Sequence, residues 1–360
     1  MSIKVSIVLP YYNTPEIRFD RCIKSVMSQT YRDLQIIVVD DGSSKESANR
    51  LDTYQSLDNR ILIIHKNNEG SAIARNTGLE AADGEYAMFV DSDDYLFPWA
   101  VEEAIKLVEY SNSDIVIGLV KKYPSNVADL DDPINSEQEI DYIKIEKDSD
   151  FESLMNHILG YPNRKFEFET GYVADGPVAK LFKTSLGKSS PFSGEPYFSD
   201  DTIWNMRLLR RCKKAIVYGH VWYGYIIFEG SKTRGYRCNC PEEYKYRNRQ
   251  QKELCDKLWP GCKKGIARTI WGNTGILCRT CLFHPLNKMT EIEKISIFID
   301  CTGKEEYRWA LKNISFDGEK KRMKRFIKEL DRFFVLAGFR IGSYLIWKSF
   351  TRRLMRHDIW

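Results

Sequence analysis

Three carboxylates stand within four residues in Asp91-Ser92-Asp93-Asp94, directly after the apolar stretch 86–90. A turn needs only one such side chain, and three of them repel one another. A divalent cation relieves this repulsion, and Mg²⁺ is usually held by one or two carboxylates together with the phosphates of a substrate. The group therefore predicts a site for Mg²⁺ or Mn²⁺ that binds a phosphorylated ligand through Asp91 and Asp93.

A second acidic pair, Asp40-Asp41, precedes Gly42 and Ser43 and follows the β-branched run 34–39. Ligands of open α/β sheets bind at the carboxyl ends of strands, so both acidic groups are expected at one sheet edge. Asp, Gly and Ser also form ordinary turns, and that interpretation stays open for this pair. The sequence has no glycine-rich phosphate loop after its first strand. A bound diphosphate would therefore need a metal.

Strands and helices alternate over the first 120 residues. Thr14 before Pro15 predicts a capped helix start. This alternation predicts an open, mostly parallel α/β sheet flanked by helices. Residues 121–150 lose the pattern and are expected to form a loop, whereas residues 242–328 look helical and charged. The predicted strands are 5–9, 34–39, 61–64, 86–90 and 114–120, and the predicted helices are 21–29, 71–82 and 98–110.

The composition indicates a globular protein. Of the 360 residues, 43% are hydrophobic and 29% charged, and the net charge of +4 is too small to indicate a nucleic-acid partner. The apolar start at residues 5–9 is too short for a signal peptide. We expect the nine cysteines to be free thiols of a cytoplasmic protein. The pairs Cys238/Cys240 and Cys278/Cys281 leave a zinc site as a minor alternative.

The C-terminal tail is basic and aromatic. Residues 319–360 contain twelve Lys or Arg and four Asp or Glu, which leaves the rest of the chain slightly acidic. As one helix, the apolar stretch 333–347 would rise about 22 Å, short of the roughly 30 Å of a hydrocarbon core. We expect the tail to lie on the cytoplasmic face of a membrane, with cations on anionic headgroups. A terminal helix pair that packs on the protein or forms a dimer is the alternative.

Four motifs in the first 95 residues resemble those of the family 2 glycosyltransferases, which have the GT-A fold. Three weaker matches extend the likeness to about residues 3–235, with Ala179 where the family has Asn and Asp200 where it has Glu. The four motifs are Pro10-Tyr11-Tyr12-Asn13, Val39-Asp40-Asp41-Gly42-Ser43, Ala74-Arg75-Asn76-Thr77-Gly78 and Asp91-Ser92-Asp93-Asp94. The weaker matches are Ala179-Lys180-Leu181-Phe182, Phe198-Ser199-Asp200-Asp201, and Tyr223-x-Tyr225 followed by Gly230-Ser231-x-Thr233.

The resemblance implies an inverting enzyme that moves a sugar from a nucleotide-diphosphate donor to an acceptor hydroxyl. The acceptor would be a glycan or a lipid-linked molecule, in polysaccharide or glycoconjugate synthesis. Asp40 is expected to accept a hydrogen bond from a uracil N–H, which favours a UDP-sugar, and the ring of Tyr11 is expected to stack on the donor. Asp201, with Asp200 beside it, would be the general base, and Asp93 with Asp91 would hold the metal. The implied donor-binding residues are Pro10, Tyr11, Asn13, Asp40, Asp41, Arg75, Asp91 and Ser92.

We expect four regions along the chain: a donor-binding half at 1–120, an acceptor-binding and catalytic half at 121–235, a helical accessory region at 236–330 and the tail at 331–360. His220 is a candidate third metal ligand by residue type alone. Two other functions stay open. One is a catalytically degenerate sugar-nucleotide-binding protein, and the other is a sugar nucleotidyltransferase, which would need the missing glycine-rich loop. The sequence does not indicate an oligomeric state.

Overall fold

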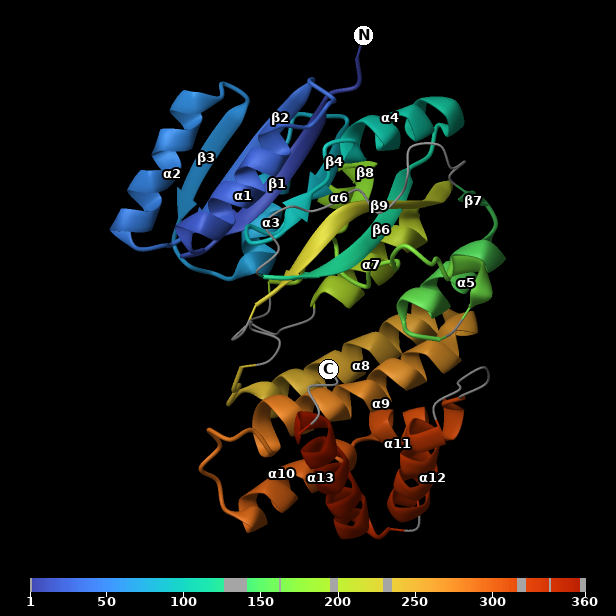
Figure 1. Ribbon diagram of the computed structural model, residues 1–360. Coiled ribbons are helices and arrows are strands. Elements are labelled where there is room, and N and C mark those ends of the chain that lie inside the picture. The colour runs from blue at the N-terminus through green and yellow to red at the C-terminus, as the bar shows by residue number, and fades with distance from the viewer. Residues whose placement is uncertain are drawn as a thin grey trace. The chain divides into compact units, whose positions relative to one another are not determined.

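The computed structural model describes residues 2–125, 141–161, 163–194, 200–228, 235–315, 322–336 and 338–356. The chain divides into two compact units (Figure 1). The first unit contains Met1–Phe151, Lys165–Pro196 and Asp200–Phe228, and the second contains Glu152–Arg164, Tyr197–Ser199 and Glu229–Trp360. Each unit is described by itself below.

One half of the sheet in the first unit is parallel, with strand order β3-β2-β1-β4. Every residue of β1 is buried, as expected for a parallel strand covered on both faces. Because β1 lies between β2 and β4, the carboxyl ends of these three strands meet at one edge, where Tyr11 pairs with Asp40. The strands predicted here are confirmed as β1 (Val5–Tyr11), β2 (Leu34–Asp41), β3 (Ile61–Lys66) and β4 (Tyr86–Phe89).

The other half of the sheet is mixed. Strand β8 (Lys180–Lys183) runs antiparallel to β4 and to β6 (Ile115–Pro124), and β9 (Ala215–Ile227) is parallel to β6. The short strands β5 (Tyr95–Leu96) and β7 (Tyr142–Ile145) both pair antiparallel with β9. The predicted open α/β sheet is confirmed, but the loop expected at residues 121–150 contains the end of β6 and all of β7. Residues 126–140 lie outside the described part.

Helix α3 packs against β1 and β2, and a glycine makes this close approach possible. A Cβ atom at Gly78 would lie 2.2 Å from Cγ1 of Val8, so only glycine fits there without movement. The predicted cap of α1 is wrong, because Pro15 is the N-cap residue and no side chain caps the helix. The helices described in this unit are α1 (Glu16–Met27), α2 (Lys45–Leu57), α3 (Ser71–Ala81), α4 (Ala100–Ser111), α6 (Thr184–Lys188) and α7 (Asp200–Arg211), with the start of α5 (Asp148–Ile158) and a 3₁₀ turn at Arg164–Phe166.

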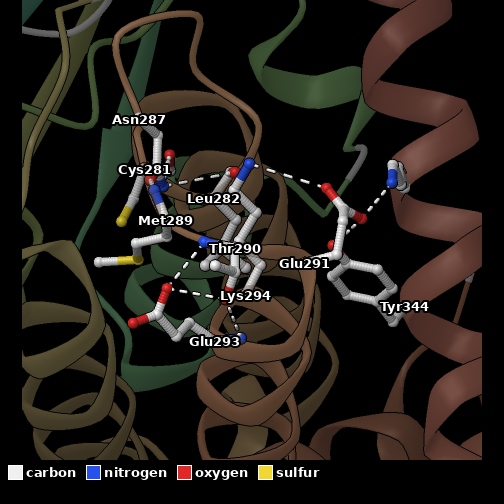
Figure 2. Close-up of polar contacts among 10 residues, drawn as sticks. Cys281, Leu282, Asn287, Met289, Thr290, Glu291, Glu293, Lys294 and Tyr344 are labelled. Carbon is white, nitrogen blue, oxygen red and sulfur yellow. Dashed lines mark hydrogen bonds and ion pairs between the residues drawn. The ribbon is translucent and has the colours of Figure 1, made fainter.

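The second unit is helical. Helix α10 begins with a capping box, in which the Thr290 hydroxyl accepts a hydrogen bond from the Glu293 N–H and the Glu293 carboxylate accepts one from the Thr290 N–H (Figure 2). Just before it, the Asn287 amide donates to the carbonyl of Cys281 at 2.8 Å and so closes the connection from α9. The helices of this unit are α8 (Cys240–Leu258), α9 (Lys263–Leu277), a π-helical turn (Cys278–Leu282), α10 (Glu291–Thr302), α11 (Glu305–Asn313), α12 (Arg322–Leu336) and α13 (Arg340–Arg356).

The C-terminal tail is part of this helical unit. The buried carboxylate of Asp331 accepts hydrogen bonds from Trp271 at 3.1 Å, Trp347 at 3.2 Å, Ser343 at 2.5 Å and the hydroxyl of Tyr307. Residue 330, where a boundary was expected, therefore lies within one compact unit. The stretch 333–347 is also not one helix, because it spans the end of α12, the turn and the start of α13.

Neither a membrane span nor a zinc site is found in the part of the chain that the structure describes. No helix there is long and apolar enough to cross a bilayer. All nine cysteines are free thiols, and eight of them are buried. Among the described residues, no three His, Cys, Asp or Glu side chains are grouped so as to hold a metal ion. The zinc alternative for the cysteine pairs therefore has no support.

Candidate active site

Two turns at the edge of the sheet are held together by Asn13. Its backbone N–H donates to the hydroxyl of Ser43 at 2.9 Å, and its side-chain oxygen accepts from the N–H of Ser44 at the same distance. Asn13 has φ of 47°, a left-handed conformation that asparagine adopts more readily than most residues. The left-handed backbone of this turn thus explains why the sequence has an asparagine at position 13.

Asp40 and Asp41 are buried and shape the same edge. Asp40 accepts a hydrogen bond from the N–H of Ser43 at 3.0 Å, and its other oxygen lies 2.7 Å from Nδ1 of His65. Asp41 accepts from Lys66 and from the backbone N–H groups of residues 69 and 70, just before α3 begins. These contacts place the loop that leads into α3. Donor binding by the two carboxylates stays a prediction.

His65 was missed from the sequence. It lies on β3 directly opposite Asp40 on β2, and its Nε2 lies 3.0 Å from Asp52. Hydrogen bonds to Asp40 and Asp52 raise the pKa of His65, although partial burial lowers it. The register between β2 and β3 predicts this contact. The sequence does not show which strands are neighbours, so the register could not be used.

Arg75 joins two acidic residues that are far apart in the sequence. From α3, its guanidinium donates to Asp91 at 2.7 Å and to Asp201 at 3.2 Å. The Arg75 side chain is only 7% exposed, whereas those of Asp91 and Asp201 are 34% and 41% exposed. Burial disfavours its charge, but the two carboxylates outweigh this and raise the pKa of Arg75. A buried cation thus holds two partly exposed carboxylates that a ligand can reach.

Phe192, in the segment between α6 and α7, links α3 to α7. The side chain of Asn76 donates to the carbonyl of Phe192 at 3.0 Å and accepts from its N–H at 2.9 Å. The ring of Phe192 stacks on Trp204 with centroids 5.1 Å apart, and the Arg75 guanidinium lies 5.5 Å from the centroid of that ring. Because Trp204 follows Asp201 by one helical turn on α7, these contacts place Asp201 beside Arg75.

A loop before β8 lies next to Asp201. The fully buried ammonium of Lys180 donates to the carbonyls of Ala174 at 3.0 Å and Gly176 at 2.5 Å. Burial lowers the pKa of Lys180 to about 8. A Cβ atom at Gly176 would be 3.9 Å from a carboxylate oxygen of Asp201. Ala179, which replaces the family's Asn, has φ of 56°, a conformation that suits Asn better than Ala.

The third carboxylate of the acidic group, that of Asp94, has a structural role. Asp94 accepts hydrogen bonds from the hydroxyl of Tyr223 at 2.7 Å and from the N–H of Ile226 at 2.9 Å. Burial raises the pKa of Asp94 well above its ordinary value, and the charges of Asp93 and Asp91 raise it further. Asp94 therefore ties this turn to β9, and Asp91 and Asp93 are the two residues of the group left as candidate metal ligands.

Two expectations about individual side chains are corrected. The ring of Tyr11 is 1% exposed and packs edge-on against Phe19, so it does not face a ligand, whereas Tyr12 is 47% exposed. His220 lies 2.9 Å from Glu103 and stacks on Trp99, so it belongs to a packed cluster rather than to a metal site.

Two donor-site residues remain from the prediction. The hydroxyl of Ser92 is buried, 2.7 Å from that of Thr14, and Pro10 lies within β1. The side chain of Asp200 lies outside the described part, although α7 begins at this residue. The proposed partnership of Asp200 with Asp201 therefore stays a prediction.

Sequence comparison finds one family and two named relatives that resemble part of the chain. Residues 6–167 match the model for Glycosyl transferase family 2. Glycosyltransferase GlyA of Streptococcus pneumoniae is 29% identical over 236 residues, which are 64% of this chain and 32% of GlyA. Glycosyltransferase GlyG of the same organism is 38% identical over 124 residues, which are 34% of this chain and 41% of GlyG. Over residues 6–167 the chain is similar to glycosyl transferase family 2, and it spans about a third of GlyA and about two-fifths of GlyG.

Solved structures share the fold. The crystal structure of residues 1–349 of S. aureus TarS in complex with UDP-GlcNAc has a TM-score of 0.66 at 17% identity, and the likeness covers 97% of this chain and 92% of that one. Mannosyltransferase PcManGT from Pyrobaculum calidifontis, in complex with GDP-Man and Mn²⁺, has a TM-score of 0.50 at 12% identity and covers 99% of this chain and 88% of that one. The GT-A type of fold is confirmed.

Proposed function

We propose that this protein is an inverting glycosyltransferase that moves a sugar from a UDP-sugar to an acceptor hydroxyl of a glycan or glycoconjugate. The observation that carries the proposal is the bridge from Arg75 to Asp91 and Asp201. It joins the residue expected to face the donor to the residue expected to act as base, although they are 110 positions apart in the sequence.

Asp201 is suited to take the proton of an acceptor hydroxyl. Its carboxylate is partly exposed and lies 3.2 Å from the Arg75 guanidinium. As the acceptor oxygen bonds to the anomeric carbon, its proton passes to Asp201. The bond from that carbon to the diphosphate oxygen breaks, and the electron pair leaves with the diphosphate. One displacement by a single base inverts the configuration at the anomeric carbon.

Asp91 and Asp93 fit Mg²⁺ or Mn²⁺ held together with substrate phosphates. Their carboxylates stand two residues apart after β4, and the third carboxylate of the group, Asp94, is buried and bonded to Tyr223 and Ile226. With no third protein ligand grouped there among the described residues, the remaining ligands would come from the substrate. When bound, the cation would stabilise negative charge on the leaving diphosphate.

The choice of uridine is supported by the position of Asp40. Asp40 lies at the sheet edge where the base is expected, and a carboxylate can accept a hydrogen bond from the N–H of uracil. TarS, which shares the fold, was solved with UDP-GlcNAc, and PcManGT, which also shares it, was solved with GDP-Man. Guanine also offers N–H groups, so the two nucleotides must be compared directly.

Titration calorimetry of UDP and GDP, each with and without Mn²⁺, tests the donor site. We expect UDP to bind more tightly than GDP, and Mn²⁺ to strengthen binding to the wild type but not to Asp93→Ala, which loses a hard oxygen ligand. The exposed Asp83→Ala on the same unit is the matched control and should keep the metal effect. Tighter binding of GDP would overturn the uridine assignment, and an unchanged metal effect in Asp93→Ala would overturn the metal assignment.

A further inference from the structure

The C-terminal helices α12 and α13 form a hairpin with a tight turn. Gly338 between them has φ of +85°, a conformation that glycine adopts without strain. A Cβ atom at Gly342 would lie 2.5 Å from the ring of Phe334, so the two helices approach closely beside the turn (Figure 1). The turn end of the hairpin is thus a compact, defined structure.

One side of the hairpin is anchored to the helical unit. Val335, Ser343, Tyr344 and Trp347 are buried. The hydroxyl of Tyr344 donates to Glu291 at the start of α10, as Figure 2 shows. These residues are therefore not available to a membrane. The tail does not present its whole apolar stretch to a bilayer, as a single helix lying in the interface would.

The other side of the hairpin exposes large apolar side chains near the turn. Phe333 is 62% exposed, Phe339 63%, and Ile341 and Leu345 both 56%. We call these four residues the tip patch. They lie within about two helical turns of Gly338. Single exposed apolar residues are ordinary, but a group of four at one end of a hairpin indicates a surface that something covers.

Three exposed arginines on α12 and α13 lie farther from the turn than the nearest residues of the tip patch. On α13, exposed Arg352 lies on the same side as Ile341 and Leu345, about 10 Å along the helix from Leu345. On α12, Arg325 and Arg332 are exposed and seven residues apart, so they share a side. No Asp or Glu occurs from residue 332 to residue 356. The hairpin is therefore apolar at its turn and positively charged behind it.

We propose that the tip patch inserts into the surface of an anionic lipid membrane, with Arg325, Arg332 and Arg352 at the level of the headgroups. Interfacial apolar residues reach about 5–10 Å into the headgroup and acyl boundary, which matches the distance of about 10 Å between Leu345 and Arg352 along α13. Arg332 directly precedes Phe333 and would lie at the edge of the inserted patch. A second copy of this chain would bring like charges together, whereas anionic lipid provides an apolar interior and negative headgroups together. The proposal does not depend on the proposed catalytic function.

Co-sedimentation of the whole chain with lipid vesicles tests the proposal. We expect binding to vesicles of phosphatidylcholine with phosphatidylglycerol, weakening as salt is raised, and little binding to phosphatidylcholine alone. Phe333→Ser/Phe339→Ser should lower the partition coefficient on anionic vesicles at least tenfold, because two large side chains no longer insert. Arg325→Gln/Arg352→Gln should lower it on anionic vesicles and remove most of its salt dependence.

The matched control is Leu57→Ser/Tyr110→Ser, which removes two apolar side chains of similar exposure, 71% and 67%, from the first unit. This variant should bind vesicles like the wild type. Circular dichroism and thermal unfolding confirm that each variant is folded. The proposal is overturned if the wild type does not bind anionic vesicles at low salt, or if the control loses as much binding as the tip variant. It is also overturned if sedimentation velocity shows a dimer that the tip substitutions dissociate.

Discussion

At the scale of single residues, the site depends on carboxylates whose surroundings give them different tasks. Asp94 is buried among hydrogen-bond donors, Asp41 holds the loop before α3, and Asp91 and Asp201 stay partly exposed on either side of Arg75. The sequence predicted that Asp91 and Asp201 belong to one site only through the family resemblance. Spacing alone does not show that a residue of α7 reaches a residue after β4.

His65 gives a prediction about pH. Because hydrogen bonds to Asp40 and Asp52 raise the pKa of His65 in the folded protein, protonated His65 stabilises the fold. This contribution is fully present below the unfolded pKa of about 6.5 and is lost as the pH rises through the folded pKa. We therefore expect the difference in Tm between the wild type and His65→Gln to be larger at pH 6 than at pH 9. Thermal unfolding followed by circular dichroism measures it.

Asp52→Asn is the companion variant for this test. It removes one of the two carboxylates that favour the protonated ring, so its own Tm should fall more at pH 6 than at pH 9. Equal Tm differences at the two pH values, for both variants, would show that His65 does not carry the charge that its contacts imply.

At the scale of elements, apolar runs and turn residues predicted β1, β2, β3, β4 and β6. Strands β1 and β2 are buried almost throughout, whereas β3 is partly exposed. Helix α2 (Lys45–Leu57) was missed because only Leu51 and Tyr54 of its residues are buried, which leaves almost no periodic apolar signal. The short strand β5 was missed because it is defined only by pairing with β9, a partner far away in the sequence.

Gly78 tests the packing of α3. In Gly78→Ala the new methyl group meets Val8 at 2.2 Å, so α3 must move away from β1. Overpacking of this kind costs about 1–3 kcal/mol. Denaturant unfolding should show that loss of stability. The control is Gly272→Ala, at an exposed position of helix α9 where no atom lies within 4 Å. It should gain stability by up to about 1 kcal/mol, since Ala favours helix over Gly. Equal effects at the two glycines would show that Gly78 is not a packing residue.

At the scale of the whole molecule, the sequence predicted the fold of the first unit but not the division of the chain. Residues 152–164 belong to the helical unit although the sequence places them between strands of the sheet, and the tail packs there through Asp331. Composition shows that a segment is basic and apolar. It does not show which of its apolar residues are buried, since that depends on neighbours such as Trp271 and Tyr307.

The central claim is that Asp201 takes the proton of the acceptor while Arg75 holds it in place. The turnover of UDP-sugars with Mn²⁺, compared between the wild type and Asp201→Asn, tests this claim most directly. The amide oxygen can still accept from Arg75 but cannot take a proton, so we expect turnover to fall by about 10²–10⁴-fold while UDP binding changes little. Glu80→Gln, at an exposed position of α3, should keep full turnover. Turnover of Asp201→Asn close to that of the wild type would contradict the account.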